Sequence, residues 1–281
     1  MSNSNPCLVN ICFTLLSRFD CFILGWLSLE GLNCSDMGLF KSLVLTFVFM
    51  LRIVGVGLDD GEVTQKGLEA IKQSENVFAE FYTNTETVDI ELLEDKTDQD
   101  IQKLSREEVE QRDRILKSAE RSDTAFLVSG DPLTATTHYD IKHRAEESGL
   151  EVEVVHAPSI LTSVAETGLN VYKFGRVVTL PENMKPDSVV EHIEKNDSVG
   201  LHTLILLDID YSADKAAEKL IEMGESLSDR DAILIERANM EDQNISYGKL
   251  SGLDPEGETP HSIVLVGDTS HKEENFIRDR G

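Results

Sequence analysis

Small residues and one acid stand at the points where apolar, β-branched segments of the sequence end. In an open α/β sheet, ligands bind beyond the carboxyl ends of the strands, so these are places where backbone can approach a ligand closely. An aspartate there can hydrogen-bond a ribose hydroxyl or meet a cation. The stretches are Gly57-Leu58, Gly130-Asp131, Ala157-Pro158-Ser159 and Ala238-Asn239.

Each stretch also has a purely structural explanation. Gly55 and Gly57 begin like a dinucleotide-binding G-x-G-x-x-G motif, but Asp60 holds the last position, which argues against a Rossmann NAD site. Gly130-Asp131-Pro132 is an ordinary turn tripeptide, and turns are its commoner use. No metal site is predicted, because the histidines lack His-x-His and His-x-x-x-His spacing. They are His138, His143, His156, His192, His202, His261 and His271.

Strand-like segments alternate with helix-like ones at the spacing of βαβ units, which predicts a mainly parallel sheet in an α/β domain. Ser105 and Glu108 form an S-x-x-E capping box that opens a helix, and Gly149 ends another. The expected strands are 51–56, 76–82, 124–128 and 151–155, and the helices 64–73, 105–121, 135–148 and 159–167. A second α/β domain is expected from strands 203–209, 232–236 and 262–266 and a helix at 213–224.

The chain is strongly acidic. It has 281 residues with 26 Lys and Arg against 52 Asp and Glu, a formal net charge of −26. Such a charge excludes a general affinity for nucleic-acid phosphates or anionic lipid headgroups. Nearly all of it lies in residues 50–281, because residues 1–49 hold two bases and three acids.

Residues 1–49 differ sharply from the rest and hold all four cysteines. A membrane or secretory element is one interpretation, but no charge-free run there makes a good bilayer span of ~20 residues. A disulfide module is another, although the cysteine spacing fits no recognised framework. We favour the third, an extension foreign to the fold, and expect domains at 50–168 and 169–281.

Several short motifs follow one another in a characteristic order along the chain, from Met50 to near its end. They are Gly55-Val56-Gly57-Leu58, Ala-Glu-Phe-Tyr-Thr at 79–83, Gly-Asp-Pro-Leu-Thr-Ala-Thr-Thr-His at 130–138, His-Ala-Pro-Ser-Ile at 156–160, Thr-Gly-Leu-Asn-Val-Tyr-Lys-Phe-Gly at 167–175, Gly-Leu-His-Thr-Leu at 200–204 and Thr259-Pro260-His261. Any one motif is weak, but the ordered set resembles that of the diphthine synthases of the archaeal type.

The resemblance implies a two-domain tetrapyrrole-methylase fold with S-adenosylmethionine (SAM) in the cleft between the domains. It implies methylation, expected to reach three methyl groups, of the amino nitrogen of a modified histidine in translation elongation factor 2. That step belongs to diphthamide synthesis. It also implies a homodimer. We expect a cytoplasmic protein, and its charge predicts no nucleic acid or membrane as partner.

Motif position carries the family's SAM contacts onto eight residues of this sequence. Thr134 departs mildly from the family, where an apolar residue is usual, although a backbone contact would survive the change. No general base is assigned; His138 and Glu166 lie near the motifs, but each fits a structural or solvent-facing role better. The eight residues are Leu58, Asp131, Thr134, Ser159, Ile160, Leu207, Ala238 and His261.

Two other functions stay open at this point. One is another methyltransferase of the same fold, acting on a tetrapyrrole or on ribosomal RNA; the other is a non-catalytic acidic binding protein. The acidic body argues against RNA, and the segments at 79–83 and 135–138 argue against a tetrapyrrole. A SAM site uses only one or two acids, so we interpret the remaining charge as an adaptation to molar salt, typical of a halophilic archaeon.

Overall fold

The computed structural model of the protein describes residues 49–80, 88–110 and 112–278. The cysteine-bearing segment before residue 49 and the end of the predicted strand 76–82 therefore lie outside the described residues. The described residues form two five-stranded sheets. None of their helices combines the length and the apolar character that crossing a bilayer requires.

The first sheet is entirely parallel, as the sequence predicts, with strand order β3-β2-β4-β1-β5. Its strands are apolar and β-branched because helices cover both faces of the sheet. Along β1, Leu51 and Ile53 pack into one core, whereas Val54 packs into the other. The strands are β1 (Met50–Gly55), β2 (Asn76–Glu80), β3 (Ile101–Leu104), β4 (Thr124–Val128) and β5 (Glu151–Val155).

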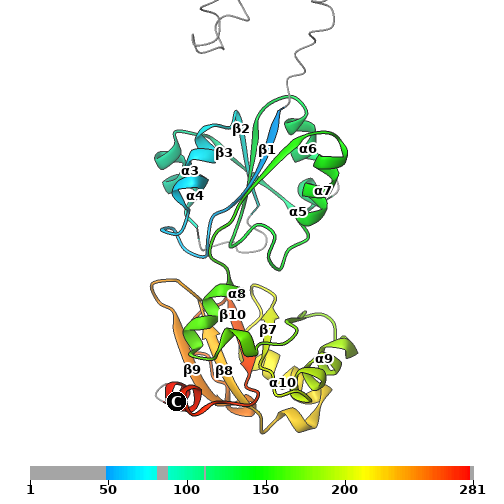
Figure 1. Cartoon of the computed structure of the whole chain (residues 1–281), viewed down its shortest axis with the longest axis vertical. Coiled ribbons are helices and arrows are strands. Elements are labelled where there is room, and N and C mark those ends of the chain that lie inside the picture. The colour runs from blue at the N-terminus through cyan, green and yellow to red at the C-terminus, as the bar shows by residue number, and fades with distance from the viewer. Residues whose placement is uncertain (1–48, 81–87, 111, 279–281) are drawn as a thin grey trace, which may run out of the picture. The chain divides into compact units, whose positions relative to one another are not determined.

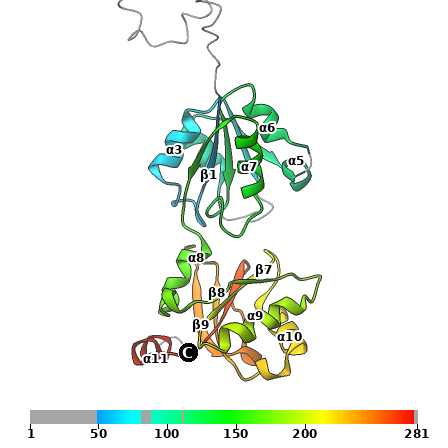
Figure 2. The same ribbon diagram turned by 45° about the vertical axis from the view of Figure 1, so that its right-hand side comes forward.

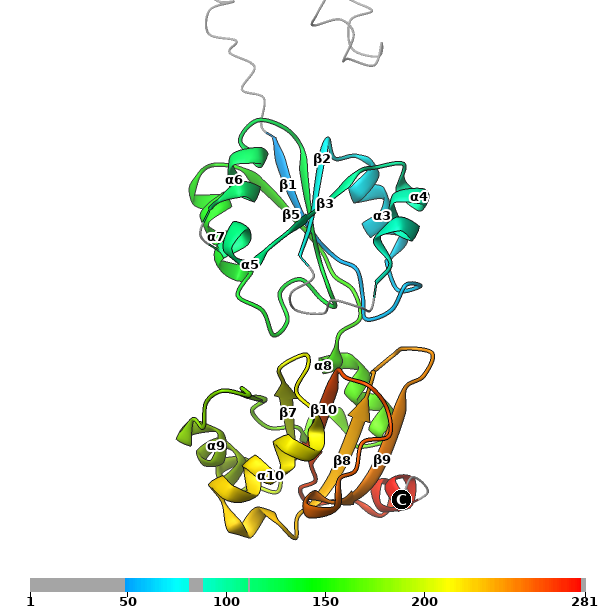
Figure 3. The same ribbon diagram turned by 180° about the vertical axis from the view of Figure 1, so that it is seen from behind.

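Helices lie on both faces of this sheet (Figures 1 and 3). The helices α3 (Gln65–Lys72) and α4 (Ile90–Thr97) bury their apolar sides in the core that contains Val54. On the other face lie α5 (Arg106–Glu110), α6 (Arg114–Ala119) and α7 (Tyr139–Glu147), packed in the core with Leu51 and Ile53. Because all five strands are parallel, their carboxyl ends meet at one edge of the sheet.

Three predicted helices differ from the observed ones, and α4 and β3 were not predicted. The helix predicted over 159–167 is an α-helix only at Ile160–Ser163 and continues as a 3-10 helix at Val164–Thr167. The capping box of Ser105 and Glu108 is confirmed, since each backbone amide donates to the other's side chain. The single helix 105–121 is wrong, because Asp113 has a φ of 52° and divides it into α5 and α6. Arg144 pairs with the Asp113 carboxylate, a contact that local helical pattern does not contain. The helix predicted from 135 begins at Tyr139, because Ala135 has a φ of 55°.

The second sheet is mixed, with strand order β6-β7-β10-β8-β9. Strands β6 (Val178–Leu180) and β7 (Thr203–Leu207) are parallel, and the remaining neighbours are antiparallel. Strands β7, β8 and β10 match predicted segments, whereas β6 and β9 were not predicted. The remaining strands are β8 (Asp231–Glu236), β9 (Asn244–Lys249) and β10 (His261–Leu265).

Two cores cover the faces of the second sheet, with α9 and α10 on one side and α11 on the other (Figure 2). The partly buried Leu58 and Ile160 pack against the core that includes Ile277 of α11. The helices α9 and α11 were not predicted. The helices are α8 (Ile160–Ser163), α9 (Asp187–Asp197), α10 (Ala213–Met223) and α11 (His271–Arg278), with the 3-10 helices η1 (Val164–Thr167), η2 (Val171–Lys173), η3 (Glu225–Leu227) and η4 (Leu250–Gly252).

Candidate functional site

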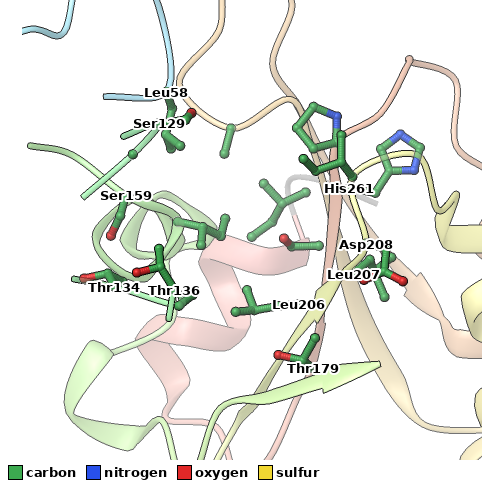
Figure 4. A pocket seen from close by; sticks show the side chains of 18 of the residues that line it. Leu58, Ser129, Thr134, Thr136, Ser159, Thr179, Leu206, Leu207, Asp208 and His261 are labelled. Carbon is green, nitrogen blue, oxygen red and sulfur yellow. The ribbon is translucent and has the colours of Figure 1, made fainter. Parts of the chain in front are cut away.

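A cavity of about 600 Å³ is lined by strand ends of both sheets and by the loops and helix starts beside them. Figure 4 shows Leu58 close to Ser129, and Leu206 and Leu207 at the end of β7 with Asp208 directly after them. All eight residues that the sequence analysis singled out line this cavity. They are Leu58, Asp131, Thr134, Ser159, Ile160, Leu207, Ala238 and His261.

Glycines at the ends of β1 and β4 hold two of the cavity's loops against each other. The Gly130 amide donates to the Gly57 carbonyl at 2.7 Å, and the Gly57 amide returns a bond to the Gly130 carbonyl at 3.3 Å. A Cβ on Gly55 would lie 2.6 Å from the Gly130 carbonyl oxygen, closer than any side chain allows. The G-x-G spacing therefore serves close packing of the Leu58 loop on the Asp131 loop.

Asp131 organises its own loop. Its Oδ1 accepts hydrogen bonds from the Leu133 amide at 3.1 Å and the Thr134 hydroxyl at 2.9 Å, and its Oδ2 lies 2.6 Å from His156 Nδ1. Burial alone would raise the pKa of Asp131, but these hydrogen bonds outweigh it and hold the pKa below its ordinary value. The buried carboxylate is thus fixed in its charged form at the cavity.

Ser129 is a polar group at the cavity that the sequence analysis did not single out. The residue is buried, and its Oγ has no hydrogen-bond partner among the described residues. A buried hydroxyl without a partner is rare in folded proteins and indicates a group that a ligand can satisfy. Its position directly before Gly130 in the same turn was the one signal that could have identified it.

His261 is held in a single tautomer by the scaffold. Its Nδ1 accepts a hydrogen bond from the Ala213 amide at 3.1 Å, so the proton is on Nε2, which donates to the Glu258 carbonyl at 3.0 Å. Because both nitrogens are engaged, this imidazole has no free lone pair with which to accept a proton. His261 therefore lines the cavity and does not serve as a general base.

Acidic side chains gather on the β7 side of the cavity. Glu182, Asp208 and Asp210 line it together with Asp131, and Arg106 contributes one guanidinium. Carboxylates around a cavity lower the energy of a cationic ligand bound there. Further lining residues that were not predicted include Thr136, Thr179, Leu206, Ile209, Ile235, Met240 and Ser262.

The two side chains weighed as general bases lie outside this lining. Burial lowers the pKa of His138 to about 4, and its ring packs edge-on against Phe126 with 5.1 Å between centroids. Glu166 accepts a hydrogen bond from the Gln243 amide nitrogen at 2.7 Å. Neither geometry brings a proton acceptor into the cavity. The described residues also contain no cluster of three or more His, Cys, Asp or Glu able to hold a metal ion.

Comparisons with known proteins agree with this geometry. Residues 50–254 match the family described as Tetrapyrrole (Corrin/Porphyrin) Methylases. The diphthine methyl ester synthase of Schizosaccharomyces pombe is 36% identical over 264 residues, covering 82% of this chain and 93% of that protein. The diphthine synthase of Halorubrum lacusprofundi is 38% identical over 255 residues, covering 81% and 95%.

A solved structure shares the fold. A crystal structure of diphthine synthase superimposes with a TM-score of 0.78 at 31% sequence identity, covering 83% of this chain and 96% of that one. At this sequence identity and coverage, the two proteins share more than the fold. The chain therefore belongs to the tetrapyrrole methylase family and, within it, to the diphthine synthases, which makes it a methyltransferase.

Proposed function

We propose that this methyltransferase uses SAM to methylate the amino group of the modified histidine of translation elongation factor 2, adding three methyl groups in diphthamide synthesis. The observation that carries the proposal is the convergence of the eight residues in one cavity. Those residues come from loops, strand ends and one helix start that are far apart in the sequence, and the family motifs name them from the sequence alone. Membership of the diphthine synthases supports the substrate.

The cavity suits SAM in size and chemistry. Its volume of about 600 Å³ lies within the ~300–1,000 Å³ typical of small-molecule sites. Leu58, Ile160 and Leu207 offer apolar surface for a purine, and Asp131 and Ser129 offer polar partners. The acidic side around Asp208 favours a ligand that carries a positive charge.

The bound cofactor would supply an electrophilic methyl group on a sulfonium. The protein's own work is then to bind, orient and shield. The paired loops of Gly57 and Gly130 fix the cavity wall, and His261 holds the start of α10 in place beside it. Positioning of this kind contributes up to ~7–11 kcal/mol to the lowering of a barrier. The carboxylates at Asp208 and Asp210 also favour a product nitrogen that becomes cationic.

Labelled SAM tests the proposal directly. We expect transfer to elongation factor 2 that bears the modified-histidine precursor, and no transfer to the unmodified factor. The label should resist mild alkali, since N-methyl groups are stable there, whereas methyl esters hydrolyse. An alkali-labile label would show that the protein forms a methyl ester, and it would overturn the proposed methylation of the amine. Transfer to a tetrapyrrole or to ribosomal RNA, or SAM binding without transfer, would overturn the proposal.

We further propose that the acidic surface suits a halophilic cytoplasm. The chain carries a net charge of −26, and like charges repel one another in a compact protein; at ~1 M salt the screening length falls to about 3 Å. Thermal unfolding in molar KCl should therefore occur at a clearly higher temperature than in 0.1 M KCl. A melting temperature that does not depend on salt would contradict this interpretation.

The organisation of the chain remains part of the proposal. Domains at 50–168 and 169–281 are supported by one five-stranded sheet in each range, and residues 1–49 are proposed to lie outside the enzyme. The family match begins at residue 50, which agrees with that boundary. Homodimerisation rests on the family resemblance.

A further inference from the structure

The carboxylate of Glu62 lies between two loops that line the cavity. Its Oε2 accepts a hydrogen bond from the Leu58 amide at 2.6 Å, and its Oε1 accepts one from Asn239 Nδ2 at 2.6 Å. Leu58 lines the cavity from the loop after β1, and Ala238, next to Asn239, lines it from the loop after β8. One side chain therefore joins the two loops, although Glu62 itself is not part of the lining.

The backbone around this contact is shaped to fit it. Gly57 has a φ of +83°, and a Cβ at that position would collide with the Glu62 side chain. Asn239 has a φ of 66°, and its backbone amide donates to Gln243 Oε1 at 2.6 Å. Gln243 in turn donates to Glu166 at 2.7 Å. The bonds form a chain from the Leu58 amide across to the segment that follows α8.

We propose that Glu62 is a positioning residue that sets the spacing between the Leu58 loop and the Ala238 loop, and thereby the shape of the cofactor cavity. The inference rests on the proposed SAM site. Glu62 acts through two neighbours and has no contact with the reacting atoms in this account. Its role is to accept two hydrogen bonds at a fixed reach, so a second acceptor of the same length should replace it.

The side-chain amide of Asn239 makes it possible to test the reach of the Glu62 side chain separately from its charge. Its Oδ1 is buried and has no hydrogen-bond partner among the described residues. In a Glu62→Gln variant, the glutamine oxygen can still accept from the Leu58 amide. The glutamine nitrogen can donate to Asn239 if that amide rotates by a half turn, since its oxygen is free to accept. Glu62→Gln should therefore keep the link without the charge.

Glu62→Asp gives the opposite test, because it keeps the charge but is one methylene shorter. A shorter carboxylate cannot reach both donors at hydrogen-bonding distance. Asn239→Asp places a second carboxylate against Glu62, and both groups can then only accept, so the loops should separate. Adding Glu62→Gln to Asn239→Asp restores one donor between them. The double variant should consequently recover what the single Asn239→Asp variant loses.

SAM affinity, measured by titration calorimetry on the full chain, separates these cases. We expect Glu62→Ala, Glu62→Asp and Asn239→Asp to weaken binding by about tenfold or more, the scale of losing a charge-assisted hydrogen bond. Glu62→Gln and the double variant should stay within about threefold of the unmodified protein. Glu69→Gln is the matched control, since it removes an exposed charge from the following helix, α3. It should bind SAM like the unmodified protein.

Three outcomes would overturn the inference or its foundation. Unchanged affinity in both Glu62→Ala and Asn239→Asp would overturn it alone. If Glu62→Gln loses SAM affinity and Glu62→Asp retains it, the charge of Glu62 is what matters, and the positioning role is wrong. No SAM binding by the unmodified protein would overturn the proposed function and this inference with it. Melting curves of each variant show whether it is folded, and the double variant keeps the test valid if Glu62→Ala unfolds.

Discussion

Replacing Asp131 by alanine is expected to abolish SAM binding in titration calorimetry. The substitution removes the acceptor for the Leu133 amide, the Thr134 hydroxyl and His156 together. Hydrogen bonds to a charged group contribute about 1.5–3 kcal/mol each, so the loop that carries Thr134 loses its main constraint. Affinity should fall by at least about two orders of magnitude, since 1.4 kcal/mol is a factor of ten.

Two variants show which property of Asp131 matters. Asp131→Asn keeps an oxygen for Leu133 and Thr134, so it should bind SAM more tightly than the alanine variant. Asp95→Ala removes one exposed carboxylate from α4 and should leave binding unchanged. Affinity in Asp131→Ala equal to that of the unmodified protein would contradict the site assignment.

Replacing Glu273 by alanine is expected to cause a large loss of stability. Its carboxylate accepts from Lys173 Nζ at 2.8 Å, the Ser270 amide at 2.7 Å and the Asn170 amide at 2.9 Å, and its side chain is 5% exposed. Removal leaves the Ser270 and Asn170 backbone amides without their acceptor. The Lys173 ammonium loses its counter-ion and keeps only the Asp268 carbonyl. Breaking a fully buried ion pair costs about 3–5 kcal/mol, and we expect the lower end of that range here because the Lys173 side chain is 28% exposed. The melting temperature should fall by roughly 10 °C.

The loss should depend on pH in a defined direction. Burial alone would raise the pKa of Glu273, but the bonds from Lys173 and the Ser270 and Asn170 amides hold it well below its ordinary value of 4.5. A carboxyl with a lowered pKa stabilises the fold above its unfolded pKa and loses that contribution as the pH falls. The gap between the unmodified protein and Glu273→Ala should therefore be full at pH 7 and narrow below about pH 4.5. Glu274→Ala, at the next position on α11, should show little change; an equal loss there would contradict the account.

Sequence reasoning succeeds where the cause of a structure is local. The parallel sheet followed from apolar segments such as 124–128, whose bounds agree with β4. The glycine at 130 and the serine at 159 mark strand ends because turns and helix starts favour those residues. Motif order then named cavity residues from both sheets. These features depend on neighbours a few positions away, which the sequence displays directly.

Features that depend on distant partners could not be predicted in this way. Asp113 divides a helix while its carboxylate pairs with Arg144, 31 residues further along the chain. Glu62 meets Asn239 across 177 positions. Glu273 stands beside Glu274 in an acidic stretch of the sequence, yet it pairs with Lys173, 100 positions away. In each case tertiary contact decides the role of a side chain whose local surroundings suggest only a solvated charge.

The mass of elongation factor 2 after reaction tests the central claim most directly. The factor bearing the modified-histidine precursor would be incubated with this protein and SAM, and the modified peptide analysed by mass spectrometry. The account predicts a gain of three methyl groups, all on the amino nitrogen of the modified histidine and all stable in mild alkali. A peptide that gains no methyl group, while the protein binds SAM, would contradict it.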